Sequence, residues 1–317
     1  MCIRDRLRNA LSIGLCALAL LCTPLRAADF AGAFLETGLG TRALGMGGAF
    51  NAVAAGPDAP YWNPAGLSRA RGLAGQTSMQ TLALDRRVNT ASVALNPRGD
   101  MGFGFAWLHA STGDIEGRTA SGQRTGSVSD VSNAFLVATG RSLGDKLSIG
   151  FAMKIFDQRI EAPFSDASTA NGHGFDVGLQ YALGKRLTLG VAARNLSASL
   201  NWKVRLTNGQ SSSTEDPLPR VLSAGIAYRP FAQGTLGFEL TGGDETRAHV
   251  GGEWTVSPLL TLRSGLRDMG GEEALGQLSA GLSLRPMRSQ RLQFHYAYST
   301  DPIGVDARTT VGLEVSF

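Results

Sequence analysis

Apolar and polar side chains alternate with a period of two residues along most of the chain. Residues 309–317 show the pattern most clearly, because every second side chain there is apolar. In an extended strand these side chains share one face, which suits lipid, and the side chains between them share the other, which suits water. A C-terminal strand of this kind is typical of the strand that closes a membrane β-barrel against its first strand. Its apolar residues are Val311, Leu313, Val315 and Phe317.

Runs with the same alternation recur at short intervals, and each is close to the roughly ten residues that a tilted membrane strand needs. With the C-terminal run they number about fourteen, so the predicted fold class is all-β, an antiparallel transmembrane β-barrel of about fourteen strands. The clear runs are 101–107, 147–155, 175–181, 187–193, 222–228, 236–240, 260–266, 278–284 and 292–298, and the weaker ones are 73–81, 88–95, 128–140 and 250–256.

Short and long connections alternate between these runs for most of the chain. Outer-membrane barrels have short turns on the periplasmic side and longer loops outside, so this alternation supports the barrel independently of hydrophobicity. The predicted short turns are 96–100, 142–145, 184–186, 229–234, 256–258 and 286–290, and the predicted long loops are 111–126, 161–171, 201–217, 268–273 and 300–306.

Residues 1–27 have the pattern of a secretory signal peptide. Three arginines precede an apolar run over residues 10–22, and a cleavage position typical of such peptides follows Ala27. The run is shorter than the roughly 18 residues that a membrane-spanning helix needs and is followed by Pro24, so we prefer the signal over an anchor. All three cysteines lie in this segment, which leaves none for a disulfide or a metal site in the mature chain.

The formal charge of +4 gives no argument for a nucleic-acid partner. Residues 1–27 hold four Arg and one Asp, which leaves 26 basic and 25 acidic residues in the rest of the chain. Beyond residue 27 no stretch is apolar enough for a membrane helix, and the 41 glycines argue against long helices anywhere. The mature chain is therefore either a soluble all-β domain or a barrel.

Charged side chains within the runs fall almost entirely on the face opposite to the apolar one. A midplane Arg or Lys facing lipid costs ~2 to 4 kcal/mol, whereas a hydrated lumen accepts it at little cost. This regularity favours the barrel over a soluble domain. The predicted lumen-facing residues are Lys154, Asp176, Arg194, Glu239, Arg247, His249, Glu253, Arg263, Arg267, Arg285, His295 and Glu314.

Catalytic and metal-binding interpretations of these residues have little support. His249 with Glu253, or Asp176 with His173, could be drawn as acid–base or metal groups, but their spacing is unspecific. No nucleophile-elbow motif is present. Because both signs of charge occur, the set fits a network that holds a plug better than an ion-selective pore. We expect no enzyme activity, no metal and no cofactor.

Residues 28–69 lack the alternation and carry the most specific motif, GTRALGMGGAF at 40–50 followed by YWNPAGL at 61–67. The glycines fit neither the dinucleotide-binding nor the Walker spacing. The segment resembles the N-terminal segment of the PorV/PorQ group, within the wider FadL-like family of outer-membrane proteins. The resemblance implies that it folds into the barrel lumen as a hatch, which divides the chain into a signal at 1–27, a hatch at 28–69 and a barrel at 70–317.

The residue types of the hatch suit a plug, because small residues allow close backbone packing and Asn63-Pro64 favours a turn. We expect Trp62, Asn63 and Pro64 to be structural, and Met46, Phe50 and Tyr61 to be the candidates for contact with an apolar ligand. The hatch motif comprises Gly45, Met46, Gly47, Gly48, Phe50, Tyr61, Trp62, Asn63, Pro64 and Gly66.

Function is less determined than fold, because one fold hosts several activities. The resemblance favours a secretion accessory that binds exported proteins through its outer loops and hands them on. The alternative is an uptake channel for hydrophobic small molecules such as fatty acids or aromatic hydrocarbons, and a structural barrel without a ligand is a third. In each case the expected location is the outer membrane of a Gram-negative bacterium, with its lipid and the barrel-assembly machinery as partners.

Overall fold

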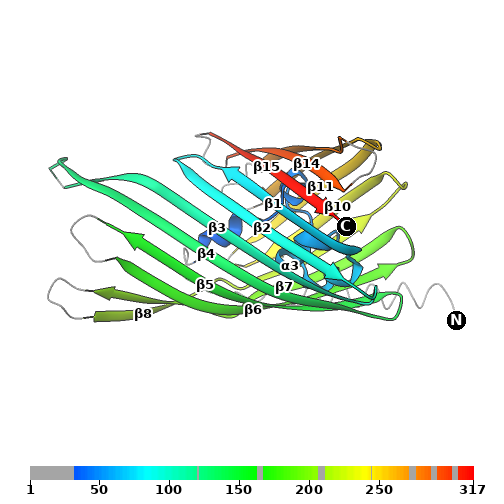
Figure 1. The fold of residues 1–317 in the computed structure, drawn as a ribbon, viewed down its shortest axis with the longest axis horizontal. Coiled ribbons are helices and arrows are strands. Elements are labelled where there is room, and N and C mark those ends of the chain that lie inside the picture. Colours follow the sequence, from blue (N-terminus) through cyan, green and yellow to red (C-terminus); the bar gives the residue numbers. More distant parts are fainter. Residues whose placement is uncertain are drawn as a thin grey trace.

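The computed structural model describes residues 32–119, 121–162, 167–205, 211–243, 245–270, 276–286, 291–301 and 306–317, so the predicted signal peptide lies outside the described residues. Fourteen antiparallel strands form a closed barrel around a short helical segment, as the sequence predicted (Figure 1). They are β1 Gly72–Thr81, β2 Arg86–Asn96, β3 Met101–Arg118, β4 Arg124–Leu143, β5 Leu147–Glu161, β6 Ser168–Leu183, β7 Leu187–Arg205, β9 Val221–Tyr228, β10 Gly234–Gly242, β11 Thr246–Ser257, β12 Leu260–Met269, β13 Gln277–Leu284, β14 Leu292–Thr300 and β15 Ala307–Ser316.

The C-terminal strand closes the ring. β15 pairs with β1 from Ala74 opposite Ser316 to Thr81 opposite Thr309, and the N–H of Phe317 donates to the carbonyl of Leu73 at 2.8 Å. Closure gives every strand two neighbours, which satisfies the backbone groups where lipid offers no hydrogen bonds. The predicted pairing of the last strand with the first is confirmed.

One side of the barrel is much taller than the other. β3 to β7 have 15 to 20 residues each, whereas β9 to β15 have 8 to 12, and in Figure 1 the tall strands project well beyond the rest. We call the end with the tall hairpins the long-hairpin end. The opposite end carries the connections 97–100, 144–146, 184–186, 229–233 and 258–259, together with residues 285–286 and 291, Arg71 and Phe317, and we call it the short-turn end.

The prediction that 201–217 is a loop was wrong. β7 continues to Arg205, and a further strand, β8 (Ser211–Pro217), pairs with its outer part. β8 and β9 share β7 as a partner and are separated by residues 218–220. The predicted loop 111–126 is likewise mostly strand. Beyond the lipid both faces of a strand meet water, so the apolar alternation that reveals a strand disappears although the backbone pairing continues.

The exterior of the barrel is apolar and the interior is filled. Phe103, Phe151 and Phe294 are 44 to 48% exposed on the outside, a surface that suits lipid. Inside lies the hatch, here residues 32–69, which contains the 3₁₀ helices η1 (Ala33–Thr37), η2 (Gly56–Asp58) and η3 (Pro64–Arg69) and the helical turns α2 (Thr41–Gly45) and α3 (Ala59–Trp62). No helix in the described part of the chain has the length and hydrophobicity to cross a membrane.

Small residues allow the hatch to approach the wall closely. At Gly47, which has a φ of 63°, a Cβ would lie 2.8 Å from the backbone of Leu266 on β12. On the opposite wall, a Cβ at Gly150 on β5 would overlap the backbone of Pro64 and Ala65. Both positions therefore require glycine, one for its conformation and its contact and the other for its contact alone.

Candidate functional site

One hatch arginine is held by a carboxylate on the wall. Arg42, on α2, donates from Nε and Nη2 to the two oxygens of Glu253 on β11, both at 2.8 Å. The Nε of Arg263, on β12, donates to the same carboxylate at 2.7 Å, and its Nη1 reaches the hydroxyl of Ser283 at 2.5 Å. Glu253 thus pairs with two guanidinium groups, one from the hatch and one from the wall, in a geometry that is bidentate for Arg42.

A second wall carboxylate holds the hatch backbone. Glu239, on β10, is buried, and its Oε2 accepts hydrogen bonds from the backbone N–H groups of Phe50 and Asn51, each at 2.8 Å. The Asn51 side chain donates to the hydroxyl of Ser223 on β9 at 2.7 Å. Two successive N–H groups directed at one carboxylate form an anion site, which here fixes the hatch to the wall.

The Trp62-Asn63-Pro64 turn is a structural joint. Asn63 accepts from the N–H of Ala65 at 3.1 Å and so caps η3, while its Nδ2 donates to Oδ1 of Asn51 at 2.5 Å. The indole N–H of Trp62 donates to the carbonyl of Leu39 at 2.8 Å. These contacts explain why a polar turn can be buried in the lumen.

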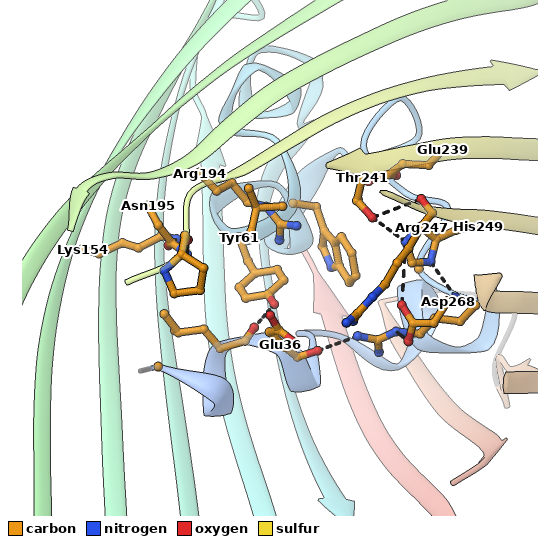
Figure 2. A pocket seen from close by; sticks show the side chains of 17 residues that line it. Glu36, Tyr61, Lys154, Arg194, Asn195, Glu239, Thr241, Arg247, His249 and Asp268 are labelled. Carbon is orange, nitrogen blue, oxygen red and sulfur yellow. Dashed lines mark hydrogen bonds and ion pairs between the residues drawn. The ribbon is translucent and has the colours of Figure 1, made fainter. Parts of the chain in front are cut away.

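Between the hatch and the wall formed by β5, β7 and β9–β12 lies a cavity of about 90 Å³ (Figure 2). The hatch contributes Leu35, Glu36 and the rings of Tyr61 and Trp62. The wall contributes mainly charged and polar side chains, so the cavity is aromatic on the side of the hatch and polar on the side of the wall. The wall residues include Lys154, Arg194, Asn195, Glu239, Thr241, Arg247, His249, Arg267 and Asp268.

Several cations of the cavity are compensated by neighbouring groups. Lys154 pairs with Asp176 at 2.9 Å and also donates to Oδ1 of Asn195 at 2.7 Å. Arg267 pairs with Asp268 at 3.2 Å. Carboxylates of the wall therefore partly compensate both cations, which weakens their attraction for an anionic ligand.

Arg194 differs from these cations. Its guanidinium carbon lies 5.6 Å from the ring centre of Tyr61 and 5.9 Å from that of Trp62 (Figure 2). Within the described part of the chain it has no ion-pair partner, and its Nε is buried without a hydrogen bond. A buried guanidinium N–H without an acceptor is costly, so this position favours an incoming acceptor such as a carboxylate.

A separate carboxylate in the hatch is buried away from the cavity. Asp58 accepts from Nε2 of Gln76 at 2.5 Å and is 3% exposed. Burial is the largest influence on this group and raises its pKa from 3.8 to about 7, although the hydrogen bond from Gln76 opposes the shift. The hatch therefore contains an acid that titrates near neutral pH.

The structure distributes the predicted residues over three roles. Glu239, Glu253 and Arg263 anchor the hatch, while Lys154, Arg194, Arg247, His249 and Arg267 line the cavity. Asp176 pairs with Lys154, and the buried His295 lies 3.5 Å from the half-buried Glu314 in a separate pair. Arg285 follows the end of β13 and lies at the short-turn end.

The predicted ligand contacts within the hatch are only partly placed at the cavity. Tyr61 lines it, but Met46 and Phe50 are fully buried in the core of the hatch and do not. Trp62, which we expected to be structural, has both roles because its N–H is bonded and its ring faces the cavity. Asn51 and Arg42 were not singled out from the sequence, although Arg42 is the one charged residue in the motif at 40–50 and this was a usable signal for it.

No metal-binding cluster of His, Cys, Asp or Glu occurs among the described residues. His249 and Glu253, which share a face of β11, have different partners: Nε2 of His249 contacts the hydroxyl of Thr241 at 2.9 Å, and Glu253 binds the two arginines. The arrangement around them is one of hydrogen bonds and ion pairs that fix the wall and hatch.

The fold and its plug define a class, the fourteen-stranded barrel with an N-terminal hatch, and solved structures of that class are similar to this chain. The toluene transporter TodX of Pseudomonas putida matches with a TM-score of 0.64 and 14% identity over 88% of this chain and 99% of its own. The Ralstonia pickettii toluene transporter TbuX gives 0.64 and 14% over 88% and 98%.

A Pseudomonas aeruginosa FadL homologue gives a TM-score of 0.61 and 14% identity over 86% of this chain and 96% of its own. At this identity the likeness concerns the fold. No protein-family model matches the chain, and neither does any curated protein.

Proposed function

We propose that this chain is an outer-membrane channel for the uptake of small amphipathic molecules, with no enzyme activity of its own. The observation that carries the proposal is the luminal cavity, in which the rings of Tyr61 and Trp62 lie beside the guanidinium group of Arg194, whose Nε has no hydrogen-bond partner among the described residues. The shared fold supports it, because TodX and TbuX are described as toluene transporters. Because outer-membrane barrels have their short turns on the periplasmic side, we place the short-turn end toward the periplasm.

The cavity favours a compact ligand with one apolar and one anionic end. A ring or short chain would pack against Leu35, Tyr61 and Trp62, and a carboxylate would accept from Arg194. A cavity of about 90 Å³ is smaller than the roughly 150 Å³ that admits benzene in a well-studied protein cavity, so entry requires the hatch side chains to shift. A long acyl chain would need a much larger displacement of the hatch.

The proposal is tested by equilibrium dialysis of the purified barrel with radiolabelled benzoate and toluene. Benzoate is expected to bind saturably, and Arg194→Gln is expected to weaken that binding at least tenfold while affecting toluene little. Arg220→Gln serves as the matched control, because Arg220 is exposed and lies outside the cavity lining. If neither compound binds saturably, and a deletion strain takes both up normally, the channel function is refuted.

The predicted secretion-accessory role is a second candidate, favoured by one observation. The β3–β4, β5–β6 and β7–β8 hairpins rise above the rest of the barrel on one side and offer a polar surface at which an exported protein could be held. Photo-crosslinkers placed in the tall hairpins would be expected to capture exported proteins in cells. The same crosslinkers on the short β10–β11 hairpin provide the comparison, and equal capture at both places would contradict this role.

A further inference from the structure

The short-turn end of the barrel is strongly basic. Nine basic residues lie in or beside its turns, against the carboxylates of Asp100 and Asp145 and the chain terminus among the described residues. All nine are exposed except Arg285, which is half-buried. We call these nine the basic ring: Arg71, Arg98, Arg141, Lys146, Lys185, Arg186, Arg229, Arg285 and Arg291.

None of the nine forms an ion pair with another described residue. The long-hairpin end is different, because Arg118 and Arg124 both pair with Glu116, Arg159 pairs with Glu161, and Arg308 pairs with Asp301. At the long-hairpin end these four cations have counter-charges within the described part of the chain, whereas the short-turn end is a surface of nine basic residues without ion pairs. Such a surface attracts an external anion.

Backbone hydrogen bonds between adjacent turns hold the basic ring along the rim. The N–H of Ala182 donates to the carbonyl of Lys146, the N–H of Arg229 donates to that of Arg186, and the N–H of Ser316 donates to that of Arg291, each at 2.8 Å. The backbone positions of these residues are therefore fixed along the perimeter of the barrel. A perimeter arrangement matches the lipids that surround a barrel.

Exposed apolar side chains accompany the basic ones in these turns. The β4–β5 and β6–β7 turns read Leu-Gly-Asp-Lys-Leu and Leu-Gly-Lys-Arg-Leu, and the first leucine of each is exposed on the outside. Across the five turns that carry such a neighbour the exposed fraction is 37 to 47%, at Leu95, Leu143, Leu183, Tyr228 and Leu284. An apolar group beside a Lys or Arg is the arrangement that sits at the boundary between acyl chains and headgroups.

The positive potential reaches the base of the hatch. Arg69, in η3, lies close enough to Arg229 for the two charges to interact, and burial together with Arg229 lowers the pKa of Arg69 to about 10. The side chain of Arg69 donates to Gln180 and has no carboxylate partner among the described residues. Repulsion between these neighbouring cations is what an anion at this rim would relieve.

We propose that the basic ring binds the headgroups of net-anionic phospholipids, such as phosphatidylglycerol, in the membrane leaflet at the short-turn end. The phosphates accept hydrogen bonds from the Arg and Lys side chains, and the adjacent leucines and Tyr228 pack against the acyl chains. An acidic protein docked below the barrel would also meet positive charge, but it would leave the outward apolar side chains unexplained. The inference depends on the barrel spanning a membrane and is independent of what the cavity binds.

The test compares spin-labelled phosphatidylglycerol with spin-labelled phosphatidylcholine around the folded mature barrel in phosphatidylcholine vesicles. The turn variant carries Lys185→Gln, Arg186→Gln and Arg229→Gln. The matched control carries Arg87→Gln, Lys203→Gln and Arg220→Gln, which are also exposed and without ion pairs but lie toward the other end. Heat-modifiable migration on gels verifies that each variant is folded.

We expect the unaltered barrel and the control to restrict phosphatidylglycerol at least threefold more than phosphatidylcholine at 50 mM NaCl. The turn variant should lose at least half of this preference, and 1 M NaCl should reduce it in all three proteins. No preference in the unaltered barrel, or equal preference in the turn variant and the control, overturns the proposal. Binding of soluble polyglutamate without any lipid preference would also overturn it and would assign the surface to an acidic protein.

Discussion

The contact between Arg42 and Glu253 offers the sharpest test of how the hatch is held. Glu253→Gln removes the carboxylate that forms ion pairs with both Arg42 and Arg263. Arg42→Gln removes only one of the two cations and leaves Glu253 paired with Arg263. Although both changes break the same salt bridge, the structure therefore predicts that Glu253→Gln is the more damaging one.

The magnitude follows from burial. Removing one partner of a buried ion pair costs ~3 to 5 kcal/mol, because the remaining charge is left without compensation. The side chains of Arg42 and Glu253 are 26% and 13% exposed, so solvent screening reduces this, and we expect about 3 kcal/mol for Glu253→Gln and about 1 kcal/mol for Arg42→Gln. A change of about 3 kcal/mol raises the population of unseated hatch by roughly 100-fold.

The assay is limited proteolysis of the hatch in the folded barrel, with single-channel conductance in planar bilayers as a second readout. Cleavage within 32–69 should accelerate in the order Arg42→Gln, then Glu253→Gln, while the barrel remains resistant to unfolding in detergent because strand pairing is unchanged. Arg159→Gln, which removes an exposed ion pair with Glu161, is the control and should have no effect. Equal cleavage of Glu253→Gln and the unaltered protein would refute the reasoning.

Three further changes test the hatch independently. Because burial raises the pKa of Asp58 to about 7, the hatch packed in the lumen keeps a proton on Asp58 between about pH 4 and 7, whereas the unseated hatch releases it. The stability of the seated hatch should therefore fall by up to about 4 kcal/mol as the pH rises through that window. Asp58→Asn should abolish this pH dependence of the proteolysis rate, measured from pH 4 to 8. Asn63→Ala should lower the free energy of unseating the hatch by about 2 kcal/mol, because the η3 cap and the hydrogen bond to Asn51 are lost. An unchanged midpoint of the urea transition of the hatch would contradict this structural role of Asn63. Gly150→Ala should displace η3 and increase hatch cleavage, whereas Gly113→Ala, where a Cβ meets open space, should not.

The period-two pattern predicted most of the fold, because each strand on its own must present one face to lipid and the other to the lumen. The runs at 101–107 and 147–155 lie within β3 and β5, and residues 309–317 cover most of β15. The same reasoning failed at 201–217, since strands that stand clear of the lipid no longer need an apolar face. β8 is held by backbone pairing with the outer part of β7, and the side-chain pattern of Ser211–Pro217 does not predict this strand.

The sequence alone therefore determined that this chain forms a barrel, and it predicted which face of each strand carries the charged side chains. Only the tertiary structure decided which of the inward charges meet. Arg42 and Glu253 are 211 positions apart, and Glu239 finds the N–H groups of Phe50 and Asn51 across a similar separation. Alternation places a charge on a face, but closure of the barrel and the packing of the hatch decide its neighbours. They leave Arg194 beside two aromatic rings, with its Nε unbonded among the described residues.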